Sequence, residues 1–185
     1  LSVTTGTNNT FIGGLAGDAI TTGTSNNAVG YDALGATTTA NQNNAFGRNS
    51  LGSNTTGADN SAFGQNTLGA NTTASNNTAV GSDALAANNT AVGKDALLAN
   101  TTANDNTAVG LQSMKANTTG TENVAVGRDS LEANTTGTQN TAIGAHALAA
   151  NTTSSYSTAV GREALKSQTT GASNTAVGRN ALAAN

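Results

Sequence analysis

Hydrophobic and polar positions follow one another along this chain in a fixed order. A small residue, a large apolar residue and a glycine form the marker, as in Ala125-Val126-Gly127, and a second apolar residue follows four places later. The marker glycine returns after 17 residues in nine of its ten steps, and after 12 residues between Gly81 and Gly93. Such regularity indicates a repeat architecture rather than a disordered low-complexity tract.

Two apolar columns result from this repeat, and both are predicted to form the structural core. The column directly before the glycine consists of Val29, Phe46, Phe63, Val80, Val92, Val109, Val126, Ile143, Val160 and Val177. The column four places after the glycine consists of Leu34, Leu51, Leu68, Leu85, Leu97, Met114, Leu131, Leu148, Leu165 and Leu182.

The repeat favours strands over helices, because no apolar stripe runs at a spacing of three and four residues. The Thr-Ala-Val phrase is typical of a short strand, with Thr and Val on one face and Ala on the other. Glycine suits the corner that follows, since it adopts positive φ at little cost. Asn at fixed offsets suits corners too, and stacked Asn side chains can form ladders. We therefore expect an all-β fold, a parallel β-solenoid or β-roll of about eleven coils.

The shortened repeat indicates how long one closed coil is. Asn88 is followed directly by Asn89, so five residues of the type Thr-Thr-x-x-x are missing there. Losing five residues would rotate a helical array by about 140°, whereas a coil closed by twelve residues only loses a loop on its perimeter. We expect Val80 and Val92 to lie in register. Residues 1–185 are expected to form a single repeat domain, a segment of a longer fibre with the Thr-Thr-x-x-x loops on one edge.

The composition excludes several classes of function. Charged residues make up 9% of the chain, aromatic residues 3%, and the net charge is -3. A nucleic-acid partner would need a basic face, and a base-stacking platform would need more aromatic rings. No apolar run approaches the ~20 residues of a membrane span. We expect no nucleic acid, no membrane insertion, no cofactor and no enzymatic activity.

Candidate chemical groups lie in the turn after the glycine. His146 is the single histidine, and no serine or cysteine stands at a fixed offset that would complete a catalytic triad. Carboxylates recur two places after the glycine, at Asp32, Asp83, Asp95, Asp129 and Glu163. A cation could bridge Asp83 and Asp95, but calcium requires six to eight oxygens and the column is interrupted. The expected structure is a solvated turn without a metal site.

The loops carry a column of threonines that is predicted to lie at the surface. Its possible contact residues are Thr55, Thr72, Thr101, Thr118, Thr135, Thr152 and Thr169. A regular threonine array on a flat solenoid could bind ice, although adjacent threonines in a strand point to opposite faces. A cell-surface receptor or glycan is the other expected ligand of these loops.

The apolar content of one coil is small, and this predicts association between chains. Each coil offers two large apolar side chains, and an Ala column runs beside the Val column. Small side chains let backbones approach closely, so several chains are expected to pack along the Ala column. The simplest arrangement is a homotrimer around an axis.

The phrase Asn-Thr-Ala-Val-Gly followed by Ala-Leu resembles two groups of proteins. It is nearly whole at Asn106–Gly120, Asn123–Gly137 and Asn174–Ala184. It is similar to the repeat shafts of phage tail fibres and tail-fibre-like bacterial surface proteins, and more distantly to the heads of trimeric autotransporter adhesins. The resemblance covers essentially the whole chain. It implies a left-handed β-roll and a structural fibre or adhesin module. Such a module is a stiff trimeric rod that attaches to a host or cell surface, placed on a virion or outside the cell. An ice-binding solenoid or a subunit of an extracellular filament are the alternatives.

Overall fold

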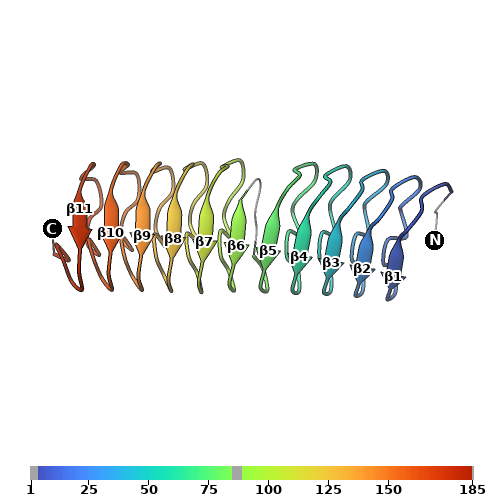
Figure 1. Ribbon diagram of the computed structural model, residues 1–185, viewed down its shortest axis with the longest axis horizontal. Helices are drawn as coiled ribbons and strands as arrows, with labels where there is room; N and C mark the ends of the chain where they lie inside the picture. The colour runs from blue at the N-terminus through green and yellow to red at the C-terminus, as the bar shows by residue number, and fades with distance from the viewer. Residues whose placement is uncertain (1–3, 85–88, 185) are drawn as a thin grey trace. The chain divides into compact units, whose positions relative to one another are not determined.

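The computed structural model describes residues 4–84 and 89–184. These residues contain eleven three-residue strands and no helix, so no helix in them could cross a membrane (Figure 1). They belong to two compact units, Leu1–Asn88 (unit 1) and Asn89–Asn185 (unit 2), and each unit is described by itself. The predicted all-β class and the parallel β-solenoid are confirmed.

The strands coincide with the predicted Thr-Ala-Val phrases. Unit 1 contains β1 (Thr10–Ile12), β2 (Asn27–Val29), β3 (Asn44–Phe46), β4 (Ser61–Phe63) and β5 (Thr78–Val80). Unit 2 contains β6 (Thr90–Val92), β7 (Thr107–Val109), β8 (Val124–Val126), β9 (Thr141–Ile143), β10 (Thr158–Val160) and β11 (Thr175–Val177). Within each unit consecutive strands pair in parallel, and each residue lies opposite the residue 17 positions away. The 17-residue repeat is therefore one circuit of the solenoid.

The coils that begin with β1 to β4 and with β6 to β10 each run from the strand through a glycine corner, a return leg and a loop at the opposite edge (Figure 1). In the β8 coil the return leg consists of tight turns, in which Asn134 N–H donates to the Leu131 carbonyl at 3.1 Å. The return leg is also bonded to the next coil, since Leu131 N–H donates to the Ala147 carbonyl at 3.0 Å. Both sides of the coil therefore take part in the stacking.

The core lies between the strand and the return leg. The Leu column projects into it from the return leg, and its members Leu34, Leu51, Leu68, Leu97, Met114, Leu131, Leu148 and Leu165 are 0% exposed. The central Ala of β2 to β11 faces these side chains and is also buried, as at Ala125 (0%), whereas the central residue of β1 is Phe11. Leu182, in the last described coil, is 51% exposed, and Leu85 lies outside the described residues.

The structure corrects the other half of the predicted core, because the column before the glycine lies on the outer face of the sheet. Val29, Val92, Val109, Val126 and Val160 are half-buried, and Phe46, Phe63, Val80, Ile143 and Val177 are 38–69% exposed. Side chains alternate along a strand, so an inward Ala turns both of its neighbours outward. The prediction that chains pack along the Ala column is therefore also wrong for the described coils, because these alanines lie inside the coil.

In a complete 17-residue coil such as that of β8, three positions besides the corner glycine have positive φ, and the sequence analysis did not expect this conformation for the apolar one. In the β8 coil they are Asp129 (φ 57), Leu131 (φ 49) and, in the loop, Gln139 (φ 55). A left-handed conformation costs an ordinary residue roughly 1–2 kcal/mol. Full burial of a Leu side chain is worth about 1.5–3 kcal/mol, which offsets that cost.

The sequence analysis predicted that the loops are additions to the perimeter of the coil. The structure shows that they also contribute to its interior. Their third residue is small, and in most described loops it packs inside the coil, as at Gly57, Gly137 and Ala103 (1% exposed). The 12-residue repeat includes residues 85–88, which lie outside the described residues. Its closure by twelve residues, and the register of Val80 with Val92, stay predictions.

Candidate interaction surfaces

A buried ladder of asparagines holds the start of each strand. Asn123 is 0% exposed, and its Nδ2 donates to Asn106 Oδ1 at 3.1 Å and to the Gly137 carbonyl at 2.9 Å. Its own Oδ1 accepts hydrogen bonds from the N–H and Nδ2 of Asn140, at 2.9 and 3.2 Å. The predicted Asn ladders are therefore present, and each one ties a coil to both of its neighbours.

A second ladder holds the other end of the loop. Asn134 Nδ2 donates to Asn117 Oδ1 at 2.9 Å and to the Gly137 carbonyl at 3.0 Å, and Asn151 Nδ2 donates to Asn134 Oδ1 at 3.0 Å. All three side chains are fully buried. Since both ends of these loops are fixed in this way, their outer side chains lie at regular positions along the loop edge.

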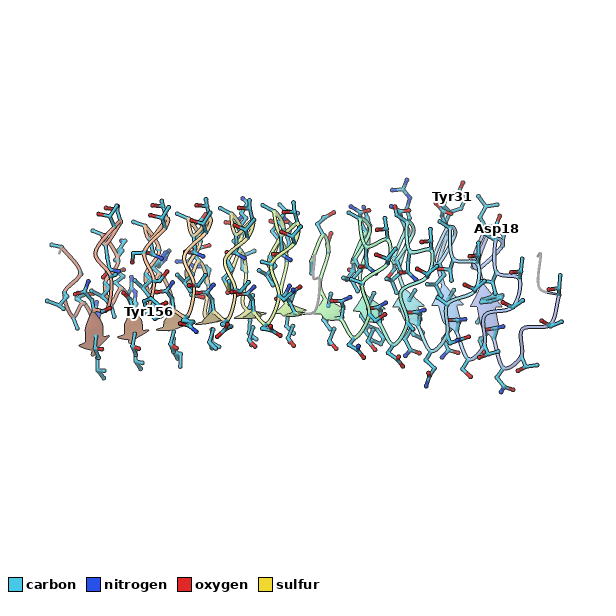
Figure 2. All side chains as sticks on the ribbon, turned by 90° about the horizontal axis from the view of Figure 1, so that it is seen from above. Asp18, Tyr31 and Tyr156 are labelled. Atoms are coloured by element: carbon cyan, nitrogen blue, oxygen red, sulfur yellow. The ribbon has the colours of Figure 1, made fainter. Side chains whose placement is uncertain are left out.

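The outer face of each unit's sheet is uncharged, and it carries a row of Val, Ile or Phe side chains beside a row that is mostly Thr, Asn or Ser. No strand contains a charged residue, and Figure 2 shows side chains projecting from the sheet away from the coil interior. In unit 1 the rings of Phe46 and Phe63 stack with their centroids 5.0 Å apart. An apolar row that repeats on every coil is typical of a surface that packs against a partner.

The predicted threonine column lies at the loop edge, but its hydroxyls are used within the protein. Thr135 Oγ1 donates to the carbonyl of Thr152 at 3.0 Å, and the same bond links Thr55 to Thr72 (3.0 Å) and Thr101 to Thr118 (3.2 Å). Thr118 and Thr152 continue the column by donating to Thr135 and Thr169. These five threonines thus support the stacking of loops, and the second threonine of a pair, such as Thr136, is exposed.

The turn edge holds the carboxylates and cations together in pairs. Arg128 Nε lies 3.3 Å from Asp129 Oδ2, and Arg162 Nη2 lies 3.0 Å from Glu163 Oε1. His146 contacts the first pair, with Nδ1 3.6 Å from Asp129 Oδ2 and Nε2 2.7 Å from Arg128 Nη2. In residues 4–84 and 89–184, no group of three His, Cys, Asp or Glu residues could hold a metal ion. Asp83 and Asp95 belong to different units, so a cation between them stays untested.

A further pair at the turn edge, Lys94 and Asp95, changes the acidity of a carboxyl group. Lys94 Nζ donates to Asp95 Oδ2 at 3.0 Å and lowers the pKa of Asp95 below its ordinary value of 3.8, against the opposing effect of burial. A lowered pKa in the folded state stabilises the protein at pH values above the ordinary pKa of the carboxyl group. This contribution is lost as the pH falls through the folded-state pKa. We expect Lys94→Ala to raise the Asp95 pKa, as followed by NMR titration of its carboxyl carbon. Lys166→Ala is the control, and an unchanged pKa in Lys94→Ala would contradict the assignment.

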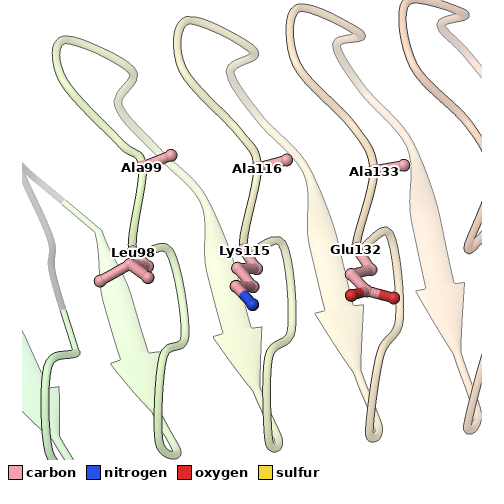
Figure 3. A pocket seen from close by; sticks show the side chains of 6 residues that line it. All are labelled: Leu98, Ala99, Lys115, Ala116, Glu132 and Ala133. Atoms are coloured by element: carbon pink, nitrogen blue, oxygen red, sulfur yellow. The ribbon is translucent and has the colours of Figure 1, made fainter.

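The return leg of unit 2 carries a shallow, open hollow of about 540 Å³ that spans three coils (Figure 3). Its lining is a row of alanines beside a row of larger side chains: Leu98, Ala99, Lys115, Ala116, Glu132 and Ala133. One cation and one anion in an otherwise apolar lining give no preference for a charged ligand.

The loop edge of unit 2 contains a side-chain row that the sequence analysis did not single out. Glu122, Gln139 and Tyr156 stand at the same place in three consecutive coils, and Gln139 Nε2 donates to Glu122 Oε2 at 2.8 Å. Tyr156 is 61% exposed. The available signal was an aromatic residue at a repeat position that otherwise holds only Asn, Asp, Ser, Gln or Glu.

Comparison of the chain with protein-family models, curated proteins and solved structures finds no match. The interpretation of these surfaces therefore depends on their own geometry and chemistry.

Proposed function

We propose that this chain is a structural fibre or adhesin module, a stiff homotrimeric rod that attaches to a host or cell surface. Its place would be a virion or the outside of a cell. The observation that carries the proposal is the row of half-buried to exposed Val, Ile and Phe side chains on the uncharged outer face of the sheet, one from each described strand. A structural role also fits the stacking, since backbone, Asn and Thr hydrogen bonds connect consecutive described coils within each unit.

Association through the outer sheet face follows from its periodicity. Two parallel copies have the same axial step of ~4.8 Å per coil, so a contact made by one coil can be made by every coil. The charged side chains Arg128, Asp129 and Glu163 lie in the turn beyond the strands and would stay solvated. A long row of exposed apolar side chains is uncommon in a monomer. In a trimer around an axis, each copy would cover the apolar row of its neighbour.

A non-enzymatic role is part of the proposal. His146 contacts Arg128 and Asp129 at the turn edge, and no nucleophilic side chain bonds to it among residues 4–84 and 89–184. Nucleophilic catalysis of the Ser–His or Cys–His type requires such a partner.

The trimer can be tested by placing charge on the outer sheet face. In Val126→Lys/Val160→Lys, several lysines would meet in the interface, so the mass from light scattering at micromolar concentration should fall to that of a monomer. Thr136→Lys, on the exposed side of a loop, is the matched control and should leave the mass unchanged. A wild-type chain that is folded and monomeric at this concentration would contradict the proposed trimer.

A further inference from the structure

Tyr156 occupies a position where the fold does not favour an aromatic residue. Its φ is 64°, and every described member of this column has positive φ, from Asn8 (φ 59) to Ser173 (φ 59). Left-handed backbone is unfavourable for bulky residues. The ring is 61% exposed, so its burial offsets little of that cost, and no bond of its hydroxyl is found in the described ranges. Packing of the coil therefore does not explain this side chain.

The backbone beneath the ring is held firmly. Tyr156 N–H donates to the Thr138 carbonyl at 3.1 Å, and Ser155 Oγ accepts a hydrogen bond from Thr138 N–H at 3.0 Å. On the other side, Ser154 Oγ donates to the Gly171 carbonyl at 2.7 Å. Figure 2, which looks onto the loop edge, shows Tyr156 close to the sheet. A ring on such a fixed loop offers a contact surface at a small further cost in entropy.

Polar groups of complementary kinds continue the row along the solenoid. Gln139 follows Tyr156 at one coil step and Glu122 follows at two, so the row is roughly 10 Å long at ~4.8 Å per step. The Gln139 amide both donates and accepts, whereas the Glu122 carboxylate only accepts. Their mutual bond of 2.8 Å holds both side chains in place.

The charge of this edge limits the ligand class. The loops 118–123, 135–140 and 152–157 contain no Lys or Arg, and Glu122 is their single charged residue. A phosphate, sulfate or uronic acid would find no cation there and would be repelled by Glu122. A neutral molecule rich in hydroxyl groups fits, because its hydroxyls can donate to Glu122 and exchange hydrogen bonds with Gln139.

We propose that Tyr156, Gln139 and Glu122 form a binding site for a neutral glycan. One pyranose ring places its C–H groups against the electron-rich face of Tyr156, and the hydroxyls of the next sugar bond to Gln139 and Glu122. This inference rests on the proposed attachment role and gives it a ligand class and a place.

The test uses the fact that the chain has two tyrosines and no tryptophan. In Tyr31→Phe, Tyr156 is the only tyrosine, so its fluorescence reports directly on the site. An array of neutral glycans is screened with the wild-type protein, and the best oligosaccharide is then titrated. We expect saturable binding that changes the Tyr156 emission. Tyr156→Ser should weaken this binding at least tenfold, and Glu122→Ala should weaken it as well.

The controls separate loss of the site from loss of the fold. Serine occupies the equivalent positions 25 and 173, so Tyr156→Ser should keep the wild-type circular dichroism and mass. Tyr31→Ser removes the other exposed tyrosine and should bind as wild type. A trimeric rod that binds no neutral glycan, or that binds equally well with Tyr156→Ser, overturns this inference alone. A monomeric chain overturns the proposed fibre even if the glycan binds.

Discussion

Gly127→Ala is expected to destabilise unit 2 by about 3–5 kcal/mol, which is at the upper end for a single substitution. Gly127 has φ 136, a region that residues with a side chain rarely adopt. An added Cβ would lie 2.6 Å from the carbonyl carbon and 2.7 Å from the carbonyl oxygen of Gly144 in the next coil. Both atoms belong to the backbone, so the neighbouring corner must move and its ladder bonds are lost. Urea unfolding followed by circular dichroism measures the effect.

Gly171→Ala is the matched control for this experiment. Gly171 is exposed and its φ is not positive, and the nearest atom to an added Cβ is the Nδ2 of Asn174 at 3.0 Å, the end of a side chain. Alanine already stands at the same loop position in Ala40, Ala74 and Ala103. Its unfolding free energy should change by less than about 1 kcal/mol. Equal effects of the two substitutions would contradict the close approach of corners in adjacent coils.

Asn123→Asp is expected to cost about 3–5 kcal/mol at neutral pH, because it leaves a buried charge without a counter-ion. The new oxygen would replace the Nδ2 group and face two acceptors, Asn106 Oδ1 and the Gly137 carbonyl, at the present distances of 3.1 and 2.9 Å. This surrounding raises the pKa of the new carboxyl group. A raised folded-state pKa favours folding at low pH, so the loss should shrink as the pH falls toward the ordinary value of about 3.9.

Asn123→Ser is the control, since the chain itself has serine at this position in one coil. Asn174 N–H donates to Ser157 Oγ at 3.4 Å there, so a serine can still accept the bond from the next coil. We expect a loss of roughly 1–2 kcal/mol for Asn123→Ser with no dependence on pH. Thermal unfolding of both variants from pH 4 to pH 8 provides the comparison. An Asn123→Asp variant whose stability is independent of pH would show that the ladder is open to water.

Much of the fold could be predicted because the repeat length equals one circuit of the chain. The 17-residue spacing predicts that Ala108, Ala125 and Ala142 lie opposite one another, and the strand pairing confirms this register. The strand at Val124–Val126, the corner at Gly127 and the Asn ladder follow from local preferences and from the stacking of identical residues. Each of these features depends on a single coil and its neighbour.

The interior of the coil could not be predicted in the same way. Alternation along a strand separates Ala125 from its two neighbours, but it does not say which face lies inside. Hydrophobicity alone favoured Val126, yet Leu131 fills the interior from the return leg, and the strand residue that faces it is the small Ala125. The left-handed backbone of Leu131 could not be predicted either, because it depends on how the return leg bends to close the coil with this side chain inside.

The features of the candidate surfaces can be separated in the same way, into those that follow from the repeat and those that depend on the folded coil. The sequence by itself determined the periodicity, the strands and the absence of charge from them, since these are properties of one repeat. Only the tertiary structure decided that the valine row faces outward and that Tyr156, Gln139 and Glu122 form a row at the loop edge. The physical reason is that volume across the coil selects the inward residue, and stacking brings together side chains that lie 17 residues apart.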